Sequence, residues 1–191
     1  MSESASIYDL LEEIDNATEG DLTLGDVTDS LKSQGFGPLI FIVAVAAILP
    51  TGAIPMVPTI CAVVISIFSI QLLFGASGPW LPKFLRDRSI KRSTFTKAKQ
   101  KAQGLAKKLD KLISKRHEHL FTQFSIKLTA VCMLFLSFVI PPMEIMPFLA
   151  ALPATAIALF ALALIARDGI IFVAAYLLAA TAVAVTLYTN I

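Results

Sequence analysis

Charged residues are almost missing from two long stretches of this chain. Residues 36–78 include no Asp, Glu, Lys or Arg, and residues 129–191 include only Glu144, Arg167 and Asp168. These stretches exclude a water-facing surface, because soluble domains carry about 25% charged residues and this chain carries 16%. The mean hydropathy of +0.75 is likewise high for a water-soluble protein. The sequence therefore predicts an integral membrane protein.

Residues that build redox, metal and catalytic centres are also scarce. Cys61 and Cys132 are the two cysteines and both lie in apolar stretches, which argues against a disulfide framework. His117 and His119 have no apparent third ligand beside them, so we expect no metal site. The sequence also lacks a glycine-rich phosphate loop and a nucleophile elbow. We therefore expect no cofactor, and no catalytic constellation is apparent.

The charges that are present are segregated along the chain. Nine of the fourteen acids fall within residues 3–29, and thirteen of the sixteen Lys and Arg fall within residues 83–116. The acidic N-terminus has no signal-peptide pattern, so no cleaved segment is expected. The basic segment has one apolar helical face, which suits an anionic leaflet or a helix packed on the domain, and its charge should keep it cytoplasmic. This amphipathic placement favours lipid over nucleic acid as the partner.

Proline clusters divide each apolar block. In the first block, helices at 38–49 and 59–74 flank three prolines, and in the second, helices at 127–140 and 148–166 flank three more. The helix at 38–49, at ~18 Å, is too short for a hydrocarbon core of ~30 Å. Pro141 follows Pro50 by 91 positions, which indicates an internal duplication whose two halves run either parallel or inverted. The final run at 169–189 is long enough to span alone.

The sequence thus predicts an all-α, polytopic membrane protein with two proline-broken repeats, re-entrant or half-helical, joined by a basic amphipathic linker. We expect a short amphipathic helix from Thr23 to Leu31, and an interfacial turn around Trp80. The expected segments are an acidic cytoplasmic helical segment (1–34), a first membrane repeat (35–82), a basic interfacial linker helix (83–124), and a second repeat with a final transmembrane helix (125–191).

Several short motifs cover most of the chain from residue 23 onward. They are Gly35-Phe36-Gly37-Pro38, Leu49-Pro50, Ile54-Pro55-Met56-Val57-Pro58-Thr59, Gln71-Leu72-Leu73-Phe74-Gly75, Pro79-Trp80-Leu81-Pro82, Met146-Pro147-Phe148-Leu149 and Ala166-Arg167-Asp168-Gly169. Together they resemble the ExoD family of bacterial inner-membrane proteins. The resemblance implies a multi-pass inner-membrane protein that supports exopolysaccharide production, with a link to tolerance of alkaline conditions.

Two groups of residues could carry chemistry in this framework. Helix N–H groups after Pro58, beginning at Thr59, could face an anion, and Glu144 at the second break could handle a proton or cation. The alternatives are a tight proline-shaped hairpin and a solvated loop acid. Arg167 and Asp168 form a corner that either anchors a turn or binds a headgroup. The predicted substrate or ion pathway comprises Pro55, Pro58, Thr59, Glu144, Pro147, Arg167 and Asp168.

Three functions fit these residues. The leading hypothesis is transport or ion exchange at paired broken helices, and the second is a non-catalytic scaffold of the polysaccharide machinery, docked through its charged segments. A third, an enzyme acting on lipid-linked phosphates, would use Arg86, Arg88 or Arg167 as anion clamps. The partners we consider are anionic lipids, a second copy in a homodimer and polysaccharide-synthesis proteins. The predicted lipid-headgroup contacts are Arg86, Arg88, Lys101, Lys107 and Lys108.

Overall fold

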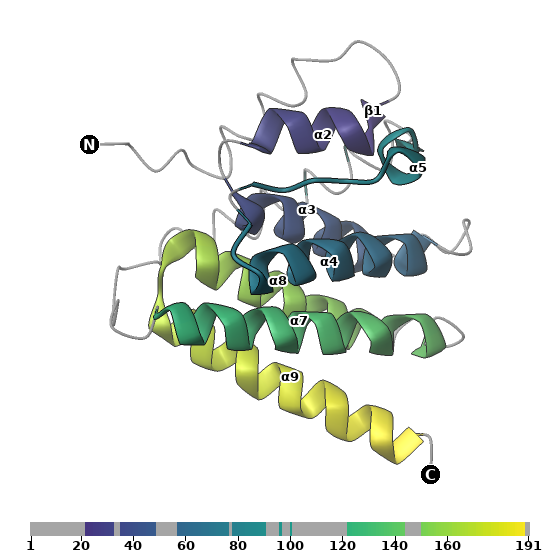
Figure 1. The fold of residues 1–191 in the computed structure, drawn as a ribbon. Helices are drawn as coiled ribbons and strands as arrows, with labels where there is room; N and C mark the ends of the chain where they lie inside the picture. Colours follow the sequence, from purple (N-terminus) through teal and green to yellow (C-terminus); the bar gives the residue numbers. More distant parts are fainter. Residues whose placement is uncertain are drawn as a thin grey trace.

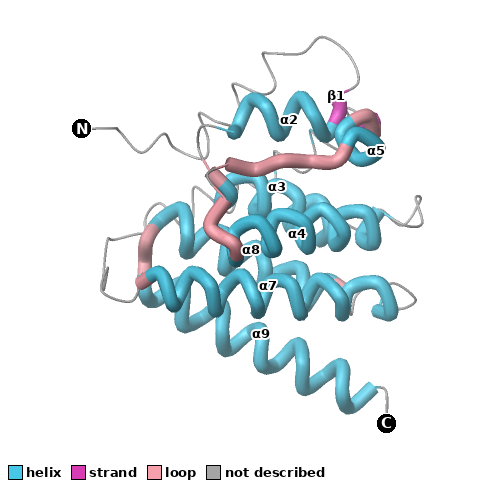
Figure 2. The backbone as a smooth tube through the Cα atoms, viewed as in Figure 1, coloured by secondary structure: helices cyan, strands magenta, loops and turns pink. Residues whose placement is uncertain are grey.

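The computed structural model describes residues 22–32, 35–48, 57–76, 78–90, 122–143 and 150–189, together with Thr96 and Gln100. Within these residues the protein is helical, with one pair of two-residue strands, so the all-α class is confirmed (Figure 2). The elements are β1 (Leu22–Thr23), α2 (Leu24–Leu31), α3 (Phe36–Ile48), α4 (Val57–Leu73), α5 (Lys83–Arg86), β2 (Ser89–Ile90), α7 (Gln123–Met143), α8 (Ala151–Ala166) and α9 (Gly169–Thr189). All except β2 are labelled in Figure 1.

Five apolar helices form a bundle built from two helical hairpins and a final helix. The first hairpin is α3 with α4, and the second is α7 with α8. The hairpins contact each other reciprocally, because α3 packs mainly on α8 while α4 packs mainly on α7. Helix α9 then returns along α8 (Figure 1). In each pair, the first helix of one hairpin therefore contacts the second helix of the other.

The core of the bundle is centred on α3 and α8. Ten residues of α3 and nine of α8 are buried, and both helices are apolar on every side. A Cβ on Gly37 would lie 2.8 Å from Ile165 Cγ1, so the start of α3 approaches the end of α8 closely. Phe160 meets Phe172 and Tyr176 of α9 edge to face, with ring centroids 6.3 and 4.8 Å away. These contacts join α8 to α3 and to α9.

Both proline-rich connections join helices at the same end of the bundle. Helices α3 and α7 begin at the opposite end and run in the same direction toward it (Figure 1). Thr186 Oγ1 lies 3.7 Å from Met143 Sδ, which brings the last turns of α9 beside the end of α7. The turn at Arg167 and Asp168 lies at the other end, where α8 passes into α9. The two hairpins therefore run parallel, the orientation that the sequence left open.

Helix α7 differs from the half-helix expected at 127–140. It begins at Gln123, continues through Pro141 and Pro142, and ends at Met143, a length of 21 residues. Both prolines lie in its last turn, so the lost N–H donors and ring clashes affect only the end of the helix. At ~31 Å, α7 is long enough to cross a bilayer, as is α9, which has its predicted bounds.

The remaining apolar helices are shorter than α7 and α9. Helices α3, α4 and α8 contain 13, 17 and 16 residues, or about 20, 26 and 24 Å. Of the described helices, Gln123–Met143 and Gly169–Thr186 pass a test for candidate membrane spans by length and composition. Residues 49–56 and 144–149, which connect the hairpin helices, lie outside the described residues.

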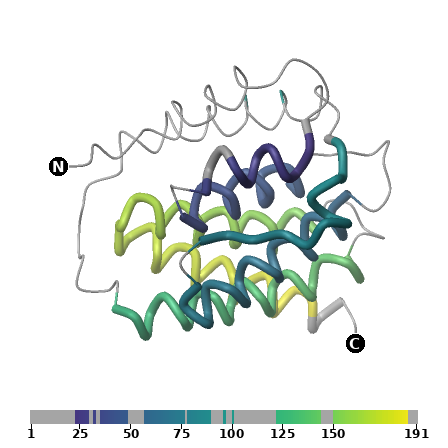
Figure 3. Tube along the Cα trace, turned by 45° about the horizontal axis from the view of Figure 1, so that its top comes forward, coloured from purple at the N-terminus to yellow at the C-terminus, as the bar shows by residue number. Residues whose placement is uncertain are grey.

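A small polar layer covers α3 on the side of the bundle opposite α9. Helix α2 lies along α3, and residues 78–90 run beside α2 in the opposite direction (Figures 1 and 3). Strands β1 and β2 pair Leu22 with Ile90 and Thr23 with Ser89. The predicted helix at Thr23–Leu31 is thus confirmed as α2, with Thr23 as its N-cap.

The start of α2 supplies a test of pH dependence. Hydrogen bonds from the Thr23 hydroxyl and then its backbone N–H lower the pKa of the Asp26 carboxyl. Because the pKa is lower in the folded state, this contribution is present above the unfolded pKa of ~3.9 and is lost as pH falls through the folded value. We expect Asp26→Asn to weaken α2 by about 0.5 kcal/mol at pH 7, measured by hydrogen exchange of the α2 amides.

The matched control for this prediction is Asp87→Asn, which removes the same charge from an exposed position after α5. This variant should leave α2 exchange unchanged at every pH. The effect of Asp26→Asn should shrink steadily as the pH is lowered below ~4. An Asp26→Asn effect of constant size down to pH 2 would contradict a role for the charged carboxylate.

Candidate functional site

The predicted pathway residues fall into two groups at opposite ends of the bundle. Pro58 and Thr59 lie in the first turn of α4, at the end where the proline-rich connections are attached. Arg167 and Asp168 lie at the other end, between α8 and α9. Pro55, Glu144 and Pro147 lie outside the described residues. The described residues therefore do not form one cluster around a single ion.

The proline-rich end brings together helix termini of both polarities. Helices α4 and α8 begin there, at Val57 and Ala151, while α3 and α7 end there, at Ile48 and Met143. A helix start carries a partial positive charge and a helix end a partial negative charge. Two starts and two ends at one place therefore offer dipoles suited to an anion and to a cation or proton.

At the opposite end, Arg167 and Asp168 have different roles. Arg167 is exposed and adopts a left-handed conformation with φ 50° at the C-cap of α8. Asp168 is only 1% exposed, and its Oδ1 accepts a hydrogen bond from the Ile170 N–H at 2.8 Å. The Asp168 carboxylate thereby caps the start of α9 and satisfies an otherwise orphan donor. This geometry agrees with the turn-anchoring alternative for Asp168.

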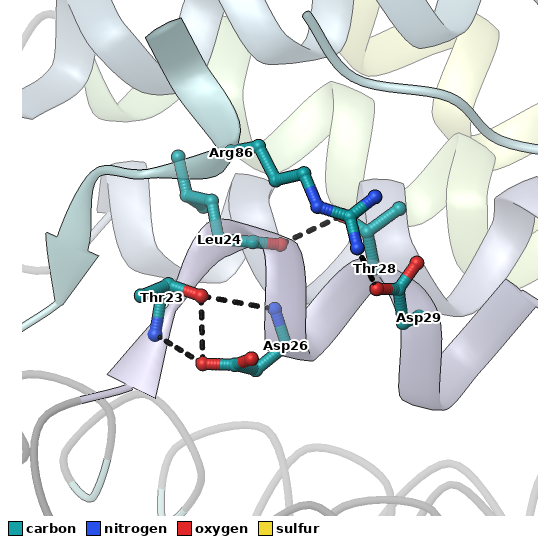
Figure 4. Close-up of polar contacts among 6 residues, drawn as sticks. All are labelled: Thr23, Leu24, Asp26, Thr28, Asp29 and Arg86. Carbon is teal, nitrogen blue, oxygen red and sulfur yellow. Dashed lines mark hydrogen bonds and ion pairs between the residues drawn. The ribbon is translucent and has the colours of Figure 1, made fainter. Parts of the chain in front are cut away.

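Arg86, predicted as a headgroup contact and as an anion clamp, is engaged within the protein. Its guanidinium pairs with the Asp29 carboxylate of α2, and Figure 4 shows the side chain extended across that helix. Gly25 makes this path possible, since a Cβ there would lie 2.4 Å from Arg86 Cγ. Arg88 remains exposed, and its backbone carbonyl accepts the Leu24 N–H at 3.0 Å. Lys101, Lys107 and Lys108 lie outside the described residues.

Three serines between the two hairpins were not singled out from the sequence. Ser66 of α4 and Ser137 of α7 share a hydrogen bond with their oxygens 2.7 Å apart. Ser69, one turn further along α4, is fully buried, and its Oγ has no hydrogen-bond partner among the described residues. The sequence feature that could have predicted this contact is a serine within each apolar run, because serine hydroxyls commonly form hydrogen bonds between helices inside membranes. Among the described residues, no three His, Cys, Asp or Glu side chains gather as metal ligands.

Comparison with known proteins gives two matches of different kinds. The family model "Exopolysaccharide synthesis, ExoD" matches residues 7–188. A curated relative, "Protein ExoD" of Rhizobium meliloti (strain 1021), is 28% identical over 163 residues, covering 81% of this chain and 65% of the relative. The chain thus spans slightly less than two thirds of that relative's length, and no solved structure matches it. Because the family model covers nearly the whole sequence, this chain belongs to the ExoD family.

Proposed function

We propose that this chain is a multi-pass inner-membrane protein that supports exopolysaccharide synthesis by moving a proton, small ion or anionic solute at its proline-rich end. The family name supports the link to exopolysaccharide synthesis. The length and apolar composition of α7 and α9 support the membrane location. The transport step rests on the arrangement of helix ends described above.

The exposed surface of three helices supports contact with lipid. Large apolar side chains are exposed on α4, α7 and α9, where they would be costly in water. Those on α7 recur at spacings of four and three and so follow one helical face. Because α2 and α5 cover α3 with charged groups, lipid would contact the α4, α7 and α9 side. The α7 residues concerned are Phe124, Leu128, Val131, Phe135 and Phe138.

Charge distribution supports one orientation. The basic segment 83–116 lies in the chain between α4 and α7. Lys and Arg are retained on the cytoplasmic side, so the ends of α4 and α8 and the starts of α3, α7 and α9 would face the cytoplasm. The proline-rich end would then face the outer side of the inner membrane. Five crossings or part-crossings would leave the end of α9 on that side.

The observation that carries the proposal is the meeting of α3, α4, α7 and α8 at one end. The ends of α3 and α8 toward the proline-rich side would lie inside a ~30 Å hydrocarbon layer, because these helices rise only about 20 and 24 Å. Irregular backbone is tolerated at such depth when protein shelters it or when it lines a wet cavity. Glu144, in one connection, is the carboxylate that we propose as the proton or cation carrier. The reciprocal hairpin pairing also supports an internal duplication.

The test is pH-driven flux in proteoliposomes that contain the purified full chain. We expect the parent protein to move protons or a coupled ion down an imposed pH gradient, and Glu144→Gln to abolish that flux. Glu118→Gln, which removes an acid from the predicted linker (83–124), is the matched control and should retain this flux. Absence of flux in the parent, or full flux in Glu144→Gln, would reject the transport step.

A scaffold function is the second candidate, and the α2–α5 layer favours it. This layer exposes Asp26, Lys83, Asp87 and Arg88 along one side of the bundle, which makes it a surface for docking another protein. Exopolysaccharide synthesis in cells would then survive Glu144→Gln and fail when Lys101, Lys107 and Lys108 are neutralised together. Loss of exopolysaccharide synthesis in Glu144→Gln, with synthesis retained when the three lysines are neutralised, would favour transport.

A further inference from the structure

Residues 78–86, here called the strap, leave the end of α4 in an extended conformation and finish as α5. Pro79, Leu81 and Leu85 are buried, so they fix the strap on the bundle. Trp80, between Pro79 and Leu81, is 63% exposed. Alternation of this kind follows from extended backbone, in which successive side chains point to opposite faces. Phe84, in the short helix α5, is 67% exposed. The strap therefore exposes one aromatic side chain near the end of α4 and a second in α5.

Gln71, in the last turn of α4, holds Trp80 in this position. Its amide Nε2 donates to the Trp80 carbonyl at 2.7 Å, and its Oε1 accepts the Trp80 N–H at 2.8 Å. One side chain thus satisfies both backbone polar groups of Trp80, a role usually taken by a neighbouring strand. Gln71 is accordingly a positioning residue that fixes the height of the indole at the end of α4.

The strap continues an apolar face of α4. Val63, Ile67, Ile70 and Phe74 follow one another at spacings of four, three and four, and Phe74 at the helix end is 83% exposed. Gly75, with φ 72°, ends the helix and redirects the chain toward the strap. The exposed surface thus passes from aliphatic residues along α4 to aromatic residues at its end, Phe74 and Trp80. Residues follow this order where a protein crosses from hydrocarbon to the headgroup region.

We propose that the start of the strap is a membrane-interface anchor, in which Trp80, together with the exposed Phe74, inserts at the boundary between headgroups and acyl chains at the end of α4. This inference rests on the membrane location given under Proposed function, not on transport. Continuity with the apolar face of α4 identifies lipid as the occupant, because a bilayer that covers that face also reaches Trp80. Helix α5 takes no part, because it lies toward the proline-rich end of the bundle (Figure 1) and the guanidinium of its Arg86 pairs with Asp29.

Trp80 is the single tryptophan of the chain, so its fluorescence reports the strap alone. The full chain is reconstituted in vesicles of phosphatidylcholine and phosphatidylglycerol that carry bromine either near the headgroup or near the acyl-chain end. We expect blue-shifted emission that shallow bromine quenches about twofold more strongly than deep bromine. Gln71→Ala should abolish this preference. Gln123→Ala, an exposed glutamine at the start of α7, should retain it.

Two results would overturn the anchor. Emission quenched by aqueous iodide but by neither bromolipid would put the strap in water, and emission quenched by neither agent would put it under protein. A second probe, Phe138→Trp in a Trp80→Phe background, separates this failure from that of the membrane location. If deep bromine quenches that probe while Trp80 is unaffected, the anchor is wrong and the membrane location stands. If neither probe is quenched by lipid, both proposals fail.

Discussion

Replacing Gly37 by valine is expected to destabilise the bundle by about 1–3 kcal/mol through overpacking. A Cβ at this position would lie 2.8 Å from Ile165 Cγ1 and 3.5 Å from the Ala161 carbonyl oxygen. Valine is a somewhat better helix former than glycine, but that gain is only about 0.5 kcal/mol. Overpacking therefore dominates. Thermal unfolding of the purified protein in detergent, followed by circular dichroism, measures the loss.

The control for Gly37→Val is a second substitution on the facing helix. Ile165→Ala removes Cγ1, the atom in the closest contact, so it should restore much of the stability lost in Gly37→Val. The double variant should then be more stable than the sum of the two single losses predicts, by about 1 kcal/mol or more. Simple additivity would mean that the close approach of α3 and α8 does not limit residue 37.

Replacing Gly25 by valine is expected to detach α2 from α5. The new Cβ would lie 2.4 Å from Arg86 Cγ and 3.2 Å from the Arg86 carbonyl oxygen, so the Arg86 side chain and one backbone segment would both have to move. We expect a cost of about 1–3 kcal/mol to the docking of α2. Hydrogen exchange of the α2 amides should accelerate about five- to 100-fold in consequence.

Gly78→Ala is the matched control for Gly25→Val. A Cβ on Gly78 would meet only the Lys32 side chain, with Cε and Cγ at 3.8 Å, which is an ordinary contact distance. Exchange in α2 should therefore stay at its parent rate. Equal acceleration in Gly78→Ala and Gly25→Val would show that any substitution in this layer loosens α2, and that the path of Arg86 across Gly25 is not the cause.

Local sequence features predicted several elements well. Helix α9 has its expected bounds because a long apolar run follows a clear turn at Arg167, Asp168 and Gly169. Helix α2 was predictable because its apolar residues recur every three or four positions, which is the spacing of an amphipathic helix, and because Thr23 before them can act as an N-cap. The error at α7 came from reading Pro141 as the end of the helix, although proline in a last turn leaves the preceding hydrogen bonds intact.

The candidate site was less predictable, because it depends on contacts between distant segments. Nothing in the local sequence around Arg86 shows that its guanidinium pairs with Asp29, 57 positions earlier. The Ser66 and Ser137 pair is 71 positions apart and joins two runs that each look uniformly apolar. The separation of Thr59 from Asp168 likewise follows from the direction in which the hairpins run.

By itself the sequence determined the helical class, the two apolar stretches, the short helices of the first hairpin and the position of the basic segment, because each depends on composition and local spacing. Tertiary structure alone decided that α3 and α8 form the core while α4, α7 and α9 expose their apolar faces. The reason is physical: α3, α4, α8 and α9 are apolar on nearly every side, so no pattern around the helix marks its inner face. Only close packing, such as that of the Gly37 backbone against the Ile165 side chain, selects which helices meet.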